Sequence, residues 1–103
     1  MTWVPIGHVD DIPTDGSGCL IEAGGERIAL FRDGGEVRAI DDECPHQGGS
    51  LAAGVACDGE VACPWHSWHF DLVTGENRDG LAMVTRTFPA RVGHDGVVEV
   101  RLT

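Results

Sequence analysis

The chain has 103 residues, with 7 Lys and Arg against 17 Asp and Glu, and its formal net charge at pH 7 is −10. A chain of this length forms one domain, and its hydrophobic fraction of 42% is typical of a folded protein rather than of a disordered acidic tail. The negative charge excludes binding of nucleic acid or anionic lipid through a basic patch, and it favours a positively charged partner.

Short segments with alternating apolar residues predict strands along the whole chain. The predicted strands are 3–6, 19–23, 26–31, 36–40, 61–62, 68–72, 85–92 and 97–102. Tight turns between neighbours are predicted at Gly24-Gly25, Asp33-Gly34-Gly35 and His94-Asp95-Gly96. Because helical periodicity is nearly absent, the chain is predicted to be all-β, with antiparallel sheets in a small sandwich or barrel.

Three stretches between the predicted strands are expected to be irregular: 41–59, 63–67 and 74–80. Within the first, Leu51-Ala52-Ala53 predicts a single helical turn that ends at Gly54. These interruptions of the strand pattern contain the residues that carry the chemistry.

Cysteine and histidine occur at close spacing in the first two irregular stretches. Cys44 and His46 lie in the first and Cys63 and His66 in the second, which gives the pattern C-x-H-x16-C-x2-H. Structural zinc sites pair their ligands as C-x2–4-C and H-x3–5-H, whereas a Cys and a His one residue apart chelate a single ion poorly. The spacing suits two adjacent metals, as in a 2Fe–2S centre in which two cysteines hold one iron and two histidines hold the other. A zinc site in an interaction module is the alternative.

At these residues the chain resembles the Rieske family of iron–sulfur proteins. The segment from Cys44 to Leu51, CPHQGGSL, resembles the first cluster loop of the family, and the segment from Cys63 to Gly75, CPWHSWHFDLVTG, resembles its second loop and the following strand. The segments 88–92 and 97–102 fit its last two strands. The resemblance covers most of the chain. It implies a single Rieske domain over 1–103, with the Rieske fold and a two-loop cluster-binding part at about 41–75.

The resemblance further implies one Rieske-type 2Fe–2S cluster per chain and no catalytic residue. The residues that would bind this cofactor and its metal ions are Cys44, His46, Cys63 and His66. Two ferric ions, two sulfides and two thiolates sum to a neutral oxidised centre, which accepts an electron more readily than a centre held by four thiolates.

Four positions distinguish this chain from the high-potential members of the family. Respiratory and photosynthetic Rieske proteins carry an additional Cys in each loop, joined in a disulfide, where this chain has Gly49 and Trp65. They also have a Ser and a Tyr that donate hydrogen bonds to sulfur, where this chain has Trp68 and Phe70, and it contains no Tyr at all. Fewer donors destabilise the reduced state, so we expect a reduction potential at the low end of the Rieske range, near about −150 mV.

The resemblance implies a monomeric Rieske-type ferredoxin. Such a protein carries one electron from a flavin-dependent NAD(P)H reductase to a terminal ring-hydroxylating oxygenase. The run from Trp68 to Gly75 and the size are also similar to the small, non-catalytic subunit of NAD(P)H nitrite reductases, whose partner is the large subunit. The first residues show no leader pattern, and no apolar stretch has the length of a membrane span, so a soluble, cytoplasmic protein is expected.

Residues outside the motif are expected to have structural roles. The other cysteines are expected to be buried or partly buried thiols, and the other histidines to lie on the surface: Cys19 and Cys57, and His8, His69 and His94. Asp41, Asp42 and Glu43 immediately precede Cys44 and are expected to form a solvated loop. Alternatively, they form part of an acidic collar for a basic partner.

Overall fold

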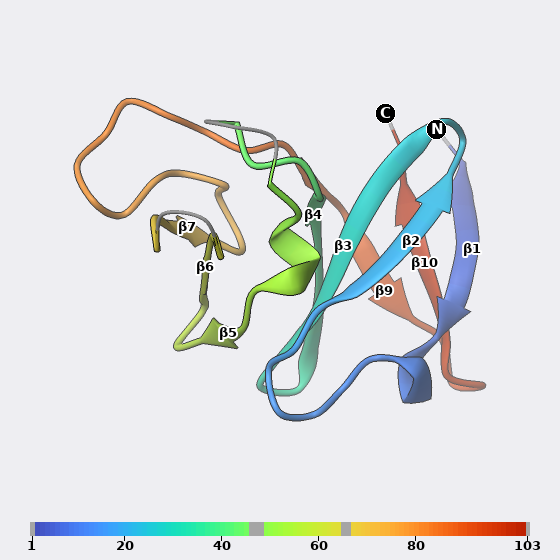
Figure 1. The fold of residues 1–103 in the computed structure, drawn as a ribbon. Helices are drawn as coiled ribbons and strands as arrows, with labels where there is room; N and C mark the ends of the chain where they lie inside the picture. The colour runs from blue at the N-terminus through green and yellow to red at the C-terminus, as the bar shows by residue number, and fades with distance from the viewer. Residues whose placement is uncertain (1, 46–48, 65–66, 103) are drawn as a thin grey trace.

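The computed structural model describes residues 2–45, 49–64 and 67–102, and it consists of short antiparallel strands in three sheets (Figure 1). The first sheet has the order β1-β10-β9, from Trp3–His8, Val97–Arg101 and Ala90–Val92. The second has the order β2-β3-β4-β8, from Cys19–Ala23, Glu26–Asp33, Glu36–Asp41 and Thr87–Phe88. The third has the order β5-β6-β7, from Ala56–Cys57, Glu60–Ala62 and His69–Asp71. The predicted all-β, antiparallel fold is confirmed.

The sheet β2-β3-β4-β8 is the middle layer of the molecule and is covered on both faces (Figure 1). On one face, Ile28 and Leu30 of β3 share an outer core with Val98 of β10. On the other face, Phe31 shares an inner core with Phe70 of β7. Since successive side chains of a strand point to opposite faces, the buried apolar run in β3 supplies residues to both cores.

The turns between neighbouring strands include one hairpin that the sequence analysis did not predict. Gly24 and Gly25 have φ values of 57° and 80°, as the predicted two-residue turn between β2 and β3 requires. Asp58 and Gly59 have φ values of 54° and 79° and join β5 to β6. The stretch 41–59 is therefore not irregular throughout, and Asp58-Gly59 is the signal that identifies this hairpin.

The single strand predicted at 85–92 is wrong, because this segment forms two short strands in different sheets. Thr87 and Phe88 of β8 pair with β4, whereas Ala90 to Val92 in β9 pair with β10. Pro89 lies between them and has no backbone N–H to donate to a ladder, although its carbonyl accepts a hydrogen bond from the Arg101 N–H at 3.0 Å. The chain therefore passes from the middle sheet to the outer sheet at this proline.

Within the described ranges, the helical elements are two single 3-10 turns, η1 (Val9–Asp11) and η2 (Leu51–Ala53). The turn η2 is the one predicted from the sequence, and it ends at Gly54. The turn η1 was not predicted, and its N-cap is His8, whose ring Nδ1 accepts a hydrogen bond from the Asp10 N–H at 3.1 Å. No helix in the part of the chain that the structure describes is long and apolar enough to cross a membrane.

Candidate metal centre

Two loops bring the predicted cysteine ligands to one buried region. The first loop follows β4 and leads to η2, and the second joins β6 to β7. Cys44 begins the first loop and Cys63 the second, and each residue is 1% exposed. Both belong to the inner core that Phe31 and Phe70 also form. Two thiols distant in the sequence therefore enter the same apolar cluster.

The predicted histidine ligands lie outside the described residues. His46 belongs to the undescribed segment 46–48, and His66 to the undescribed segment 65–66. The structure therefore brings together Cys44 and Cys63 but does not test the complete ligand set. Trp65, which stands where high-potential members have a Cys, also lies outside the described residues.

Backbone hydrogen bonds close the first loop at its base. The Cys44 N–H donates to the Gly49 carbonyl at 2.8 Å, and the Leu51 N–H donates to the Asp42 carbonyl at 2.7 Å. Because the two ends of the loop are paired, Cys44 has a defined position relative to the strand that precedes it.

The Asp42 carboxylate stabilises the first loop in addition to these backbone hydrogen bonds. Asp42 is 2% exposed, and its Oδ1 accepts hydrogen bonds from the Ser50 hydroxyl at 2.8 Å and the Ala52 N–H at 2.9 Å. Its Oδ2 lies 3.6 Å from Nη2 of Arg27. The expectation of a solvated loop is therefore wrong for Asp42, although Glu43 is exposed. A run of three acidic residues gives no sign that the central one points inward.

Backbone contacts also define the second loop. The Cys63 N–H donates to the Trp68 carbonyl, and the Ser67 N–H donates to the Cys63 carbonyl, both at 2.8 Å. Ser67 has a φ of 56°, in the left-handed region, where the chain turns back toward β7. Trp68 is partly buried against the inner core and Phe70 is fully buried in it, so both aromatic side chains contribute to the packing beside this loop.

Gly54 connects the two loops by close backbone contact. It is buried, and a Cβ at this position would collide with the carbonyl oxygen of Ala62, the residue before Cys63. The Gly54 N–H donates to the Leu51 carbonyl at 2.9 Å. The end of η2 therefore lies directly against the start of the second loop, at a distance that only glycine permits.

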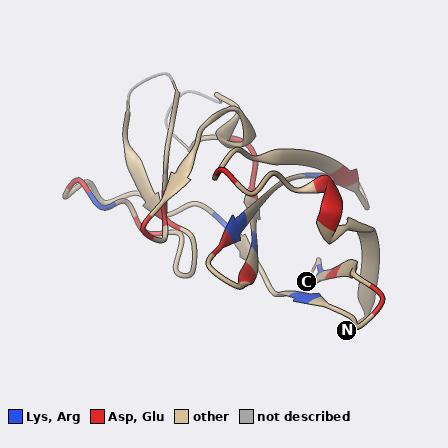
Figure 2. Ribbon diagram, turned by 90° about the horizontal axis from the view of Figure 1, so that it is seen from below, with Lys and Arg blue, Asp and Glu red and all other residues tan. Residues whose placement is uncertain are grey.

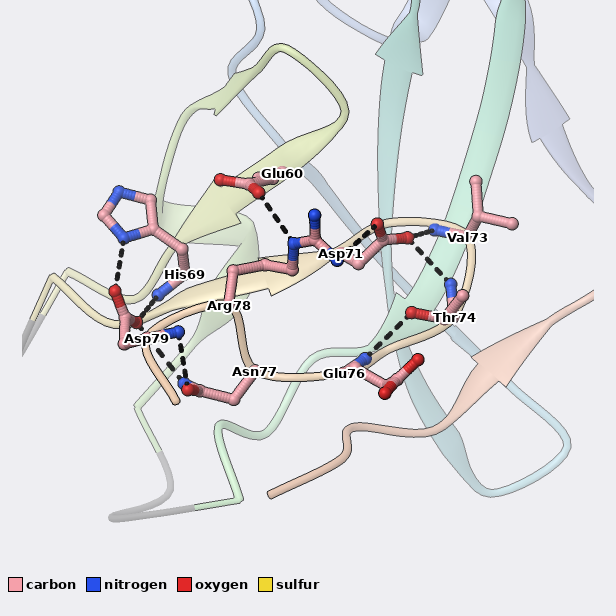
Figure 3. Close-up of polar contacts among 9 residues, drawn as sticks. All are labelled: Glu60, His69, Asp71, Val73, Thr74, Glu76, Asn77, Arg78 and Asp79. Atoms are coloured by element: carbon pink, nitrogen blue, oxygen red, sulfur yellow. Dashed lines mark hydrogen bonds and ion pairs between the residues drawn. The ribbon is translucent and has the colours of Figure 1, made fainter. Parts of the chain in front are cut away.

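Surface carboxylates hold the chain that follows the second loop (Figure 3). Asp79 accepts a hydrogen bond from the His69 N–H at 2.7 Å, and its Oδ1 lies 3.3 Å from the His69 Nδ1. Asp71 Oδ1 accepts from the N–H of Thr74 at 2.9 Å. The N–H of His69 lowers the pKa of Asp79, and the N–H of Thr74 lowers the pKa of Asp71. Both carboxylates therefore remain ionised well below neutral pH.

The remaining cysteines and histidines follow the expectations with one exception. Cys19 is partly buried, and burial raises the pKa of its thiol. Cys57 is exposed in β5, which corrects the expectation that it is at least partly buried. The side chains of His8 and His69 are about two-fifths exposed, and His94 is exposed, as expected for surface residues.

The described cysteines fit a metal centre that contains sulfur and iron. Thiolates are soft ligands that suit both iron–sulfur centres and zinc, and Cys44 and Cys63 enter an apolar cluster from two separate loops. The pattern C-x-H in one loop and C-x2-H in the other adds a histidine to each cysteine. Two loops that each carry a Cys and a His suit the class of protein that holds a binuclear iron–sulfur centre.

The sequence model of the Rieske [2Fe-2S] domain matches residues 2–89, and the chain belongs to this family. The predicted cofactor, a Rieske-type 2Fe–2S cluster, is therefore confirmed at the level of the family, which favours it over the zinc alternative.

Relatives of this chain include both large proteins and small ferredoxin components. Apoptosis-inducing factor 3 of Mus musculus and of Homo sapiens are each 39% identical over 72 residues, which is 70% of this chain but 12% of theirs. The chain thus spans about an eighth of the length of these two relatives. The anthranilate 1,2-dioxygenase ferredoxin subunit of Burkholderia cepacia is 36% identical over 101 residues, which is 97% of this chain and 92% of that one.

Solved structures match the whole fold. The ferredoxin of carbazole 1,9a-dioxygenase from Nocardioides aromaticivorans IC177 has a TM-score of 0.88 and 25% identity over 100% of both chains. A protein from Mycobacterium tuberculosis is described as an NADH-dependent nitrite reductase small subunit. It has a TM-score of 0.89 and 27% identity, and the match covers 99% of this chain and 96% of that one. The expected Rieske fold is confirmed, and so is the expected likeness to electron carriers of the ferredoxin kind.

Proposed function

We propose that this chain is a one-electron carrier whose cluster is held by Cys44 and Cys63 on one iron and by His46 and His66 on the other. The main support for this proposal is that Cys44 and Cys63 enter one buried core from two separate loops, each of which is closed by backbone hydrogen bonds. The proposed domain comprises the whole chain, 1–103, with its cluster-binding part at about 41–75.

The bound cluster would accept one electron and release it again. The residues of the chain would provide the two thiolates, exclude water from their side of the site, and hold the loop ends in place. Phe70, at the position where high-potential members carry a hydroxyl, is 0% exposed and has no hydroxyl to donate. The absence of a hydroxyl donor at this position supports the proposal that the reduction potential is low.

The charge distribution supports basic redox partners. The seven basic residues are all arginines. Each has a contact within the molecule: Arg27 with Asp42, Arg32 with the carbonyls of Val9 and Ile12, Arg38 with Asp33, Arg78 with Glu60, Arg86 with Glu26, Arg91 with Glu99, and Arg101 with the ring of Trp3. The surplus carboxylates lie on both halves of the molecule (Figure 2). A partner therefore meets a surface dominated by negative charge.

We propose a flavin-dependent NAD(P)H reductase as the electron donor and a terminal ring-hydroxylating oxygenase as the acceptor. The support is that the two small relatives described above are named as ferredoxins of dioxygenases. A monomeric state suits a carrier that must dissociate from both partners. A cytoplasmic location is part of the proposal, because the reductase operates where NAD(P)H is available.

The test of the ligand assignment is cysteine replacement in the purified, cluster-loaded protein. Cys44→Ser and Cys63→Ser should each abolish the visible absorption and electron paramagnetic resonance signals of the 2Fe–2S centre, because an iron loses its thiolate ligand. Cys57→Ser is the matched control, since Cys57 is exposed and outside the motif, and it should keep both spectra. An unchanged spectrum in Cys44→Ser would refute the assignment.

A second candidate function is that of a nitrite reductase small subunit, which the structural match to the Mycobacterium tuberculosis protein favours. The two functions differ in how the chain associates. A carrier should elute as a monomer and should be reoxidised by a catalytic amount of a terminal dioxygenase. A subunit should co-purify with a large reductase in a fixed ratio, and that result would decide against the free carrier.

A further inference from the structure

Asp42 is the one charged residue that is buried in the part of the chain that the structure describes. Its side chain is 3% exposed, whereas the guanidinium partner, Arg27, has a side chain that is 60% exposed. Burial of an ionised carboxylate is unfavourable unless hydrogen bonds and a counter-charge stabilise it. A charge placed here therefore depends on a specific set of contacts.

The contacts of Asp42 join the two ends of the first loop. Asp42 lies two residues before the start of the loop, and its Oδ1 accepts hydrogen bonds from the Ser50 hydroxyl and the Ala52 N–H on the returning segment. Its own backbone also takes part, because the Asp42 N–H donates to the Arg27 carbonyl at 3.0 Å. One side chain thus fixes the segments on both sides of the loop that begins at Cys44.

The charge of Asp42 is also close to the proposed centre. Asp42 and Cys44 are two residues apart, so their Cα atoms are within roughly 7 Å of each other. Solvent screens a buried charge much less than an exposed one. Arg27 compensates this charge in part, since its mostly exposed guanidinium is itself screened. Reduction adds one negative charge to the cluster, and a nearby negative charge that is poorly screened opposes this addition.

We propose that Asp42 is a positioning residue of the first loop and that its buried charge holds the reduction potential of the neighbouring centre down. The inference rests on the ligand assignment proposed above, because it requires the cluster to be bound at Cys44. It adds to that assignment a residue outside the motif that sets the redox property of the site.

The test compares Asp42→Asn with Glu43→Gln in the cluster-loaded protein. Asn keeps the oxygen that accepts from Ser50 and Ala52 but removes the charge. Asp42→Asn should raise the equilibrium constant for one-electron reduction about tenfold, which corresponds to about 59 mV upward in voltammetry. Glu43→Gln removes an exposed charge one residue nearer to Cys44, and it should change this constant at most about twofold because solvent screens it.

The positioning role has a separate readout. Asp42→Ala removes both hydrogen bonds and should accelerate the loss of cluster absorbance in the presence of an iron chelator about tenfold or more, whereas Asp42→Asn should stay within about threefold of the wild type. An Asp42→Asn potential no higher than that of Glu43→Gln would overturn the electrostatic role, and an unchanged rate in Asp42→Ala would overturn the positioning role. Failure of the ligand assignment is distinguishable, because it would appear as an intact cluster in Cys44→Ser.

Discussion

The two loops that begin at Cys44 and Cys63 are built in different ways. In the first, a buried carboxylate is added to the backbone hydrogen bonds, since Asp42 joins the loop ends from the interior. The second is the connection of a hairpin, closed by backbone hydrogen bonds between Cys63, Ser67 and Trp68. The charged residues drawn in Figure 3 hold the chain that follows the second loop, and they lie at the surface.

This difference indicates where each loop is vulnerable. Hydrogen bonds to a buried charge contribute about 1.5–3 kcal/mol each, and removal of the Asp42 carboxylate would leave both the Ser50 hydroxyl and the Ala52 N–H without this acceptor. Ion pairs on the surface contribute about 0–1 kcal/mol. The first loop should therefore be sensitive to single substitutions in the interior, whereas the second should tolerate changes in any one of its surface contacts.

The largest effect is expected at the point where the two loops touch. In Gly54→Ala the new Cβ would meet the carbonyl oxygen of Ala62, and backbone on both sides cannot move away easily. We expect a loss of about 3 kcal/mol in the free energy of unfolding, measured by urea denaturation of the cluster-loaded protein, with faster loss of the cluster.

The control for this substitution is Gly35→Ala. A Cβ on Gly35, in the turn between β3 and β4, has nothing within 4 Å, and this glycine is not among those with a positive φ. The free energy of unfolding of Gly35→Ala should stay within about 0.5 kcal/mol of that of the wild type. Equal effects of the two substitutions would mean that close contact between the loops is not what Gly54 provides.

An intermediate effect is expected from Ser50→Ala, which weakens the first loop without removing its buried charge. The Asp42 carboxylate would lose the hydroxyl donor at 2.8 Å but keep the Ala52 N–H. We expect a decrease of about 1.5–3 kcal/mol in the free energy of unfolding. Ser67→Ala in the second loop is the comparison, since the backbone N–H of Ser67 makes the hydrogen bond to the Cys63 carbonyl. A decrease as large as that of Ser50→Ala would contradict the difference between the loops.

The smallest effect is expected from Asp79→Asn, and it should depend on pH. The hydrogen bond from His69 lowers the pKa of Asp79 in the folded protein, so its stabilisation is complete above the unfolded pKa of about 3.9. It is lost as the pH falls through the folded value. The variant should therefore unfold at a slightly lower urea concentration than the wild type at pH 7. This difference should shrink below about pH 4.

Three outcomes of this titration would be informative. A difference that is constant from pH 7 to pH 3 would show that the stabilisation does not come from the ionised carboxylate. A difference that grows as the pH falls would contradict the sign of the pKa change. A difference at pH 7 larger than that of Ser50→Ala would reverse the ranking of the two loops.

Much of the fold could be predicted from the sequence because strand alternation and glycine turns act locally. The strands near the first two hairpins and the turn at Leu51-Ala52-Ala53 were found in this way. The division of 85–92 could not be read from alternation alone, because both halves are extended and the change of sheet occurs at Pro89. The β5–β6 hairpin had a local signal, Asp58-Gly59, inside a stretch dominated by the metal-ligand pattern.

The candidate ligand residues of the site could be predicted from the sequence, but the contacts that hold the first loop in place could not. The spacing of Cys44, His46, Cys63 and His66 identifies the pattern, because ligand spacing is a property of sequence. The burial of Asp42 is a property of tertiary packing, since it depends on Ser50 and Ala52 folding back over it. Neighbouring acidic residues are usually solvated, so only the structure distinguishes Asp42 from Glu43.

The position of β3 as a shared wall has a consequence for how the protein can fail. Leu30 faces the outer core and Phe31, the next residue, faces the inner core that contains both cysteines. Disorder in one core should therefore remove part of the packing surface of the other, because within the described residues β3 belongs to both. Retention of the cluster should thus report on the integrity of both cores, including the outer core formed with β10.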